Sequence, residues 1–180
     1  MNTRCIITAI WVGQLVLGLY LAKPSLAADP DAQSAGLKQS DRSVVHLYFA
    51  YKNIAFLASE ERVIVHSDDI IEFGKRIIEA LIKGPKRDFM RTIPSGTALR
   101  AFYVTSDGTA FVDLTQAVAD NHPGGSISEI LTIYSIVNSL ILNISEVKTV
   151  KIMIAGRESI TLAGHIDIRF PFKANMLLIR

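Results

Sequence analysis

The sequence predicts an α+β fold, a two-layer sandwich in which two helices pack on one face of a mixed β-sheet. Two segments, residues 69–83 and 126–143, carry apolar residues at helical spacing between clear start and stop signals. Runs of β-branched and aromatic residues lie before, between and after these segments, as expected for strands. Asp107-Gly108 separates two of the runs, and Asp-Gly in this setting is the strongest short-range hairpin signal.

The first 27 residues have the order of a signal peptide. A short basic start precedes the apolar run at residues 5–22, and Lys23-Pro24 then interrupts any helix. Small residues in Ser25-Leu26-Ala27 predict cleavage before Ala28. An uncleaved membrane anchor is the alternative, but cleavage is favoured because polar residues interrupt a run that is already near the lower length limit for spanning a bilayer, about 18 residues. Either form would export the rest of the chain.

The folded domain is expected at residues 44–172, between a flexible linker at 28–43 and a C-terminal tail at 173–180. The linker has almost no large apolar side chains and no periodicity. A buried strand is predicted at residues 44–50 and a second at 62–66, and the two are expected to pair.

The first helix, residues 69–83, has well-marked ends. Asp69 is the expected N-cap, with Glu72 completing a capping box, and Gly84-Pro85 ends the helix. Gly74 lies beside the apolar face and would permit a close approach to the sheet, at about 1 kcal/mol relative to Ala. The apolar face consists of Ile70, Phe73, Ile77, Ile78 and Leu81.

A turn at residues 93–97, centred on Gly96, leads into the predicted hairpin. Its strands are expected at residues 98–105 and 109–114, on either side of Gly108. The alternation in the second strand indicates that one side is buried more fully than the other.

The second helix is unusually apolar. It follows the loop His122-Pro123-Gly124-Gly125, and Ser126 with Glu129 has the pattern of a capping box. Its polar stripe is narrow, so the helix is either buried on more than one side or offers a docking face. The candidate docking residues are Ile133, Ile136 and Leu140. Further strands are predicted at residues 147–154, 159–162 and 165–170.

Motifs of catalysis, of cofactor binding and of metal binding are not found in the sequence. None of the histidines has a ligand-spaced partner, and no serine lies in a nucleophile elbow. Asp68-Asp69 is explained more simply by helix capping than by paired-carboxylate chemistry. The only cysteine, Cys5, falls in the N-terminal apolar run. We therefore expect neither an enzyme nor a cofactor.

The charge distribution argues against nucleic-acid binding. The first 27 residues hold two of the 19 basic residues and none of the 17 acidic ones, so the remaining chain is formally neutral. Positive charge gathers locally on and after the first helix, at Lys83, Lys86 and Arg87. This local cluster is either a solvated helix face or a contact for anionic lipid or cell-wall polymer.

In the order of its segments the chain resembles the GerMN domain, the sporulation and spore germination domain. The resemblance is carried by four stretches: residues 45–49, Ala80 to Pro85, Ile93 to Thr97 with the hairpin after it, and Gly124-Gly125-Ser126 with Gly164-His165-Ile166-Asp167. It implies a non-enzymatic module similar to ring-building modules, in exported and often membrane-associated proteins. It also implies that Gly84, Pro85, Gly96 and Gly164 are structural positions. Only one copy is present, where a tandem pair is found in the best-known architecture.

Together these features predict an exported interaction or assembly module of the bacterial cell envelope. Its partner would be an envelope protein or a second copy, bound through the second helix or a sheet edge. The alternative is a small-ligand or peptidoglycan-binding protein that assists a wall hydrolase and uses Tyr48, Tyr51 and Phe102. A hydrolase with a site dispersed in the sequence is a third hypothesis.

Overall fold

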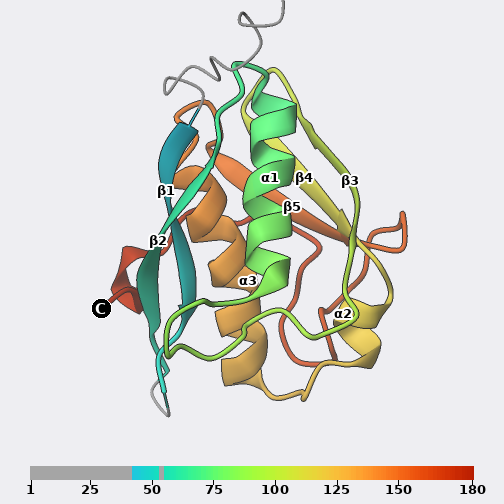
Figure 1. Cartoon of the computed structure of the whole chain (residues 1–180). Coiled ribbons are helices and arrows are strands. Elements are labelled where there is room, and N and C mark those ends of the chain that lie inside the picture. Colours follow the sequence, from blue (N-terminus) through green and yellow to red (C-terminus); the bar gives the residue numbers. More distant parts are fainter. Residues whose placement is uncertain (1–41, 53–54) are drawn as a thin grey trace, which may run out of the picture. The chain divides into compact units, whose positions relative to one another are not determined.

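The computed structural model describes residues 42–52 and 55–180. The predicted signal peptide and nearly all of the predicted linker lie outside this part of the chain. No helix in the described part has the length and apolar character needed to cross a membrane. Figure 1 shows the elements, which are β1 (Arg42–Ala50), β2 (Leu57–Val65), α1 (Ile70–Lys83), β3 (Leu99–Val104), β4 (Thr109–Leu114), α2 (Ala117–Asp120), α3 (Ser126–Ile141), β5 (Thr149–Ile154) and η3 (Met176–Leu178).

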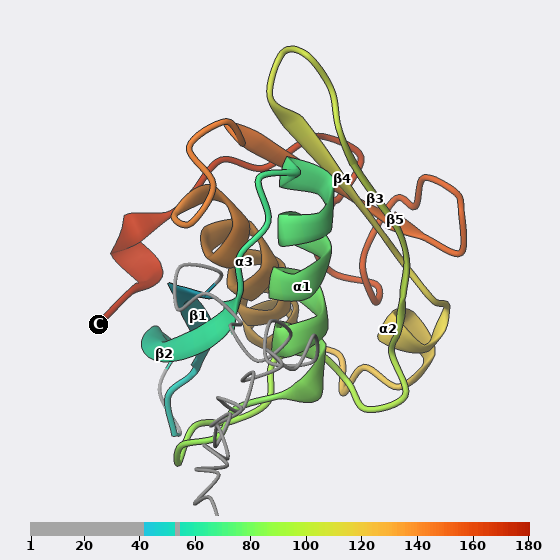
Figure 2. The same ribbon diagram turned by 45° about the horizontal axis from the view of Figure 1, so that its top comes forward.

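The α+β prediction is confirmed, and the strands divide between two sheets. β3, β4 and β5 form a mixed sheet in which β3 pairs antiparallel and β5 parallel with β4. β1 and β2 form a separate antiparallel hairpin. Both α1 and α3 contact strands of the two sheets, and in Figures 1 and 2 the helices lie between the hairpin and the mixed sheet. The expected single layer of strands is therefore split by the helices.

The hairpin forms as predicted, but its second strand is longer than the sequence suggested. β2 begins at Leu57, five residues before the predicted start at Arg62. Glu60 and Arg62 point to the buried face and form an ion pair there. Two charged residues at core positions conceal the alternation that normally identifies a strand.

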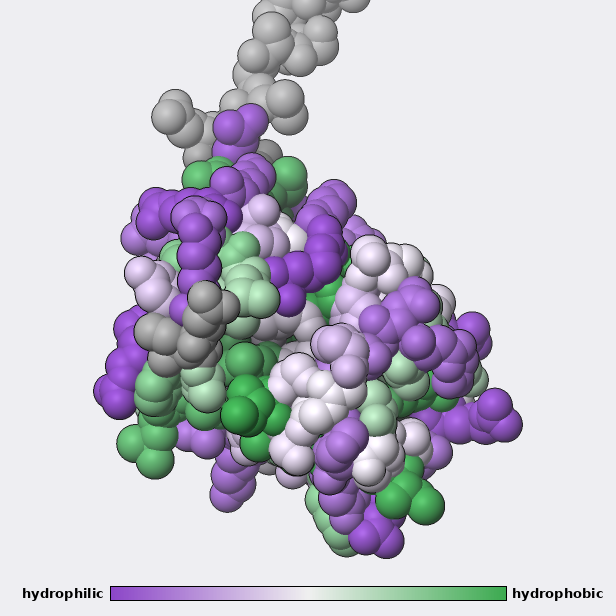
Figure 3. Space-filling view, turned by 90° about the horizontal axis from the view of Figure 1, so that it is seen from below, coloured by the Kyte–Doolittle hydropathy of each residue, from purple (hydrophilic) through white to green (hydrophobic). Residues whose placement is uncertain are grey.

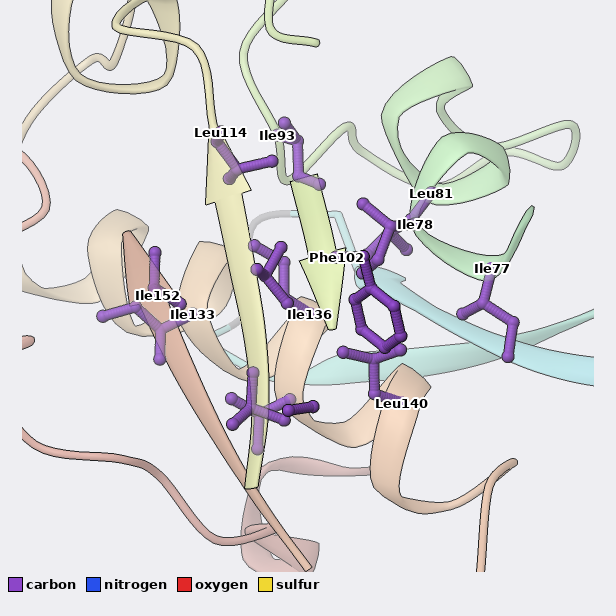
Figure 4. Packing of buried hydrophobic residues seen from close by; sticks show 14 of the residues in the cluster. Ile77, Ile78, Leu81, Ile93, Phe102, Leu114, Ile133, Ile136, Leu140 and Ile152 are labelled. Carbon is purple, nitrogen blue, oxygen red and sulfur yellow. The ribbon is translucent and has the colours of Figure 1, made fainter. Parts of the chain in front are cut away.

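One apolar core joins the helices to both sheets. Figure 4 shows Ile77, Ile78 and Leu81 of α1 with Phe102 of β3, Leu114 of β4 and Ile152 of β5. The residues at α1 recur at the spacing predicted for its apolar face, and all three are fully buried. Burial of each such side chain stabilises the fold by roughly 1.5–3 kcal/mol.

The caps of α1 are confirmed in part. The Asp69 carboxylate accepts a hydrogen bond from the Ile71 N–H at 2.9 Å, and Gly84 ends the helix with φ at 88°. Glu72 pairs with Lys75 instead of completing a capping box, and the Asp69 N–H is bound by the Ser67 hydroxyl. The predicted turn glycines Gly96, Gly108 and Gly164 also adopt positive φ.

The capping box predicted for α3 is wrong. Gly125 is the N-cap, with φ at 90°, and Ser126 is the first helical residue, without a side-chain cap. The expected partner, Glu129, is completely buried, and its carboxylate binds the segment at residues 163–166.

The C-terminal segment differs from its prediction. Residues 159–170 form an isolated bridge between Thr161 and Asp167 instead of two short strands. The predicted tail at 173–180 packs on the domain, because Asn138 exchanges two hydrogen bonds with the backbone of Asn175. At its end, the Arg180 N–H donates to the Leu57 carbonyl of β2.

Candidate interaction site

The apolar docking face expected on α3 is not available. Ile133, Ile136 and Leu140 are completely buried, and Figure 4 shows them within the core. The helix contacts strands of both sheets, which explains its apolar character without an external partner. On the surface in Figure 3, apolar residues appear in separate patches between hydrophilic ones. The prediction of a docking face at these three residues is therefore wrong.

The narrow polar stripe of α3 closes one edge of the hairpin. The Tyr48 N–H donates to the Ser139 hydroxyl at 3.0 Å, and the Ser135 hydroxyl donates to the Tyr48 carbonyl at 2.5 Å. The Asn143 amide accepts from the His46 N–H and donates to the His46 carbonyl. The side chains of a helix thus take the place of a neighbouring strand along β1.

The repeat lengths of helix and strand explain this match. Ser135, Ser139 and Asn143 are four residues apart, so they advance along one helix face by about 6 Å per step. His46 and Tyr48 are two residues apart on β1, a step of about 6.6–6.8 Å. Because the steps nearly coincide, successive side chains meet successive backbone groups. At the end of β1 the Met90 N–H donates to the Ala50 carbonyl and completes the closure.

The outer edge of β2 is open over its middle. At one end the Leu57 carbonyl accepts from the Arg180 N–H, and at the other the Val65 carbonyl accepts from the Arg76 guanidinium. Between these ends, no backbone group of Ser59, Glu61 or Val63 is bonded outside the hairpin by any described residue. We call these three residues the β2 edge. A strand edge with free N–H and C=O groups is a template for pairing with another chain.

Exposed valines lie beside the β2 edge. Val44 and Val63 face each other across the hairpin, and their side chains are 60% and 62% exposed. Val65, next on the same face, is also more than half exposed. Three β-branched apolar side chains thus lie on the solvent-facing surface of a hairpin whose other face is core.

An aromatic pocket adjoins the start of the β2 edge. It is a cavity of about 480 Å³ lined by Tyr51, Phe56, Ala58, Ser59, Phe89 and Arg180. The rings of Tyr51 and Phe89 are 6.1 Å apart and tilted by 54°, and the Arg180 guanidinium lies 4.5 Å from the centre of the Phe56 ring. Of the aromatic residues predicted for ligand binding, Tyr48 and Phe102 are buried, and only Tyr51 reaches this pocket.

The three predicted basic residues are exposed at the end of α1 and in the following loop. This loop is held by Glu60, which is buried in β2. Its carboxylate accepts from the N–H groups of Lys86 and Arg87 and pairs with Arg62. Burial would raise the pKa of Glu60, but the two N–H donors and the guanidinium together hold it below its usual value.

A second buried carboxylate, Glu129, anchors the segment at residues 163–166. It accepts from the N–H groups of Ala163, His165 and Ile166 and lies 2.7 Å from the His165 Nδ1. Burial would raise the pKa of Glu129, but these donors lower it. The carboxylate is therefore occupied by backbone N–H groups and by the His165 side chain.

The histidines contact separate partners. His46 bonds Ser59, His66 bonds Ser43, His122 bonds Thr132 and His165 bonds Glu129. No group of three His, Cys, Asp or Glu side chains in the described part of the chain is placed to hold a metal ion.

An open groove of about 880 Å³ lies between the start of α1 and the β3–β4 hairpin. Its carboxylates are Asp68, Asp69 and Glu146, of which Asp69 caps the helix and Asp68 is fully exposed. The dispersed hydrolase site of the third hypothesis would require such groups to converge in a closed cleft. Here one carboxylate is committed to the backbone, and the groove is open to solvent.

The comparisons with known proteins agree on the fold. The family model for Germane, described as sporulation and spore germination, matches residues 46–160. No curated protein matches the chain. The first GerMN domain of the sporulation protein GerM from Bacillus subtilis superposes with a TM-score of 0.58 at 18% identity, covering 75% of this chain and 98% of that domain.

Two further solved structures are similar. A candidate lipoprotein from Clostridium perfringens gives a TM-score of 0.54 at 24% identity, covering 75% of this chain and 89% of that one. The tandem GerMN domains of GerM give 0.54 at 17% identity, and the alignment covers 75% of this chain but only 46% of the tandem structure. The match to the described domain thus corresponds to one copy of the repeated unit.

Proposed function

Because the chain belongs to the Germane family of sporulation and spore germination, we propose that it is a non-catalytic interaction module of the cell envelope. In this proposal it binds a protein partner by accepting an extended segment at the β2 edge. The module is exported, and its role is to position other components.

The observation that carries the proposal is that one edge of the hairpin is closed by side-chain hydrogen bonds and the other edge is open. The β1 edge is closed by four side-chain hydrogen bonds, two from α3 and two from Asn143 just after it, whereas the β2 edge is open from Ser59 to Val63. Strand addition at such an edge gives affinity through main-chain hydrogen bonds and specificity through alternate side chains. The exposed Val44 and Val63 lie on the face that alternate residues of a bound segment would cover.

The charges at this edge favour a different protein over a second copy. If two β2 edges paired along their full open length, Ser59 would face Val63 of the other copy. Glu61 would then lie opposite its own counterpart. Directly opposed like charges destabilise a strand pair.

The buried polar side chains support a structural role over a catalytic one. Glu60 and Glu129 bind backbone N–H groups, and Asp113 accepts from the Gly156 N–H and from Arg100. The Lys151 ammonium, which is almost fully buried, donates to the Ile168 carbonyl. Each of these groups connects two segments of the fold through hydrogen bonds.

Export is supported by the order of the N-terminal residues and by the similarity to the Clostridium perfringens candidate lipoprotein. Intact-mass measurement of the protein isolated from its native cell tests this part. A chain that begins at Ala28 and fractionates with the envelope is the expected result, and a cytoplasmic chain that begins at Met1 would contradict it.

Site-specific photo-crosslinking of the full chain in its native cell tests the partner. A photoreactive phenylalanine analogue would replace Glu61 or Val63, with exposed Glu79 of α1 as the control position. We expect adducts of one defined mass from the β2 edge and none from position 79. Adducts of twice the mass of the chain would instead indicate a second copy, and yields equal to the control at both edge positions would contradict the proposal.

A proline variant distinguishes strand pairing from general proximity. The backbone carbonyls of Leu57 and Val65 are bonded outside the hairpin, and strand geometry alternates, so the N–H of Val63 also points outward. Val63→Pro therefore removes a donor only from the open edge. We expect Val63→Pro to abolish the adduct formed from position 61 while the free energy of unfolding changes by about 1 kcal/mol or less. Arg62→Pro, whose N–H faces β1, is the matched variant that should destabilise the fold.

A further inference from the structure

We propose that the segment bound at the β2 edge carries an aromatic side chain that enters the aromatic pocket, with a carboxylate beside it that pairs with Arg180. This inference rests on the proposed function and names the chemistry of the partner. The pocket and the β2 edge then form one continuous recognition surface.

The continuity is provided by Ser59. Ser59 is the first residue of the β2 edge, and it also lines the pocket together with Ala58. A segment that pairs with Val63, Glu61 and Ser59 in turn therefore arrives at the pocket. At the pocket the outer edge of β2 is already bonded to the C-terminal segment, because the Arg180 N–H donates to the Leu57 carbonyl. The partner backbone must leave the sheet at this point, and its next side chain faces the aromatic residues.

The shape of the pocket favours a side chain over a sugar. Its volume of about 480 Å³ lies within the range of small-ligand sites. The rings of Tyr51 and Phe89 are tilted to each other and form a notch, whereas a sugar ring stacks best on a flat exposed platform. An inserted aromatic ring would meet both rings at the offset or edge-on angles that aromatic pairs prefer.

The charge around the pocket favours an acidic neighbour for that aromatic residue. The Arg180 guanidinium lies over Phe56 and forms no ion pair within residues 42–52 and 55–180. Lys52 and Asp88 neutralise each other nearby. The exposed side chains of Lys86 and Arg87, on the loop that leads to Phe89, add positive charge.

Both walls of the pocket are fixed to β2 before any ligand binds. The Glu60 carboxylate holds the N–H groups of Lys86 and Arg87, and the Phe89 N–H donates to the Arg87 carbonyl. On the opposite side Arg180 is tied to the Leu57 carbonyl through its own N–H. A site whose walls are already held in place loses less entropy on binding.

Short acetylated and amidated strand peptides titrated into the full chain, followed by amide NMR shifts, test this inference. Each peptide is a run of alternating Thr and Val with one added dipeptide, Phe-Glu, Phe-Gln, Ala-Glu or Ala-Gln. Each dipeptide is placed at the N-terminus in one peptide and at the C-terminus in another. We expect Phe-Glu to bind about tenfold more tightly than Ala-Glu, and a few-fold more tightly than Phe-Gln at low salt. In the Arg180→Gln variant the preference for Glu over Gln should vanish while the preference for Phe remains.

The outcomes separate the two proposals. If peptides with all four dipeptides shift Ser59, Glu61 and Val63 with equal affinity, strand pairing stands and the pocket inference is overturned. If none shifts these residues, the proposed function itself fails. Phosphatidylglycerol vesicles and chitotetraose, a wall-type glycan, are the competing probes. Arg180-dependent binding of either, without any peptide preference, would also overturn the inference.

Discussion

Gly74 of α1 lies directly against the ring of Phe102 in β3. A Cβ atom at position 74 would be 2.2 Å from the Phe102 Cε1, closer than any two carbon atoms can approach without bonding. Both residues are buried, so the helix and the mixed sheet meet at this point with no space for a methyl group. The absence of a side chain at Gly74 sets the distance between these two elements.

Gly74→Ala is therefore expected to destabilise the protein. Alanine favours a helix by about 1 kcal/mol over glycine, but overpacking a core typically costs about 1–3 kcal/mol. We expect a net loss of up to about 2 kcal/mol in the free energy of unfolding, measured by urea denaturation. Phe102→Leu, which shortens the opposing side chain, should recover most of this loss in the double variant. Simple additivity of the two changes would show that the contact does not limit the approach.

The closure of the β1 edge by α3 makes a second prediction. Ser139→Ala removes the acceptor of the buried Tyr48 N–H, and an unsatisfied buried donor costs about 1–3 kcal/mol. The same change at exposed Ser145 should alter the free energy of unfolding by less than about 0.5 kcal/mol. Hydrogen exchange should report faster exchange of the Tyr48 amide in the Ser139 variant. An unchanged rate would mean that the hydroxyl does not serve the strand.

The sequence was sufficient for the elements whose pattern is local. Both long helices, the hairpin at Asp107-Gly108 and the parallel-paired strand β5 were predicted within a few residues. Asp69 and Gly84 cap α1 as expected, because a cap depends on neighbours within one turn. The order of these local signals also led to the correct family.

Most of the missed features depend on contacts between distant segments. Glu129 looked like a capping partner at three residues from Ser126, but its carboxylate binds a segment 34 to 37 residues away. The narrow polar stripe of the second helix gave no sign of its partner, which is the edge of β1, 87 to 97 residues earlier. The apolar residues Ile133, Ile136 and Leu140 are buried in the core that α3 forms with the other elements. Helical periodicity identifies a face but does not show what covers it.

Glu129 should contribute strongly to stability. Glu129→Gln keeps the shape of the side chain but replaces one acceptor oxygen with an NH₂ group that opposes N–H donors of residues 163–166. We expect a loss of about 3 kcal/mol in the free energy of unfolding. Glu79→Gln, on the exposed face of α1, is the matched control and should be nearly neutral. Amide NMR should locate the effect at Ala163, His165 and Ile166. An effect confined to the start of α3 would favour the capping role instead.

His122 should make the domain less stable as the pH falls. Its Nδ1 accepts from the Gly124 N–H at 3.1 Å, and its Nε2 lies 2.9 Å from the Thr132 hydroxyl, which itself donates to the Thr92 carbonyl. This network requires the neutral ring with its proton on Nε2. Partial burial lowers the pKa of His122 and outweighs the opposing attraction of Glu129.

A histidine with a lowered pKa takes up its proton more readily in the unfolded chain than in the fold. Its contribution to stability is complete above the usual pKa of 6.5 and is lost as the pH falls below that value. The lowered pKa of Glu129 acts in the same direction at lower pH, below its usual 4.5. We therefore expect the free energy of unfolding to decline from pH 7 to pH 5, and the decline to be smaller in His122→Gln. Equal slopes in the two proteins would show that the His122 ring is not the titrating group.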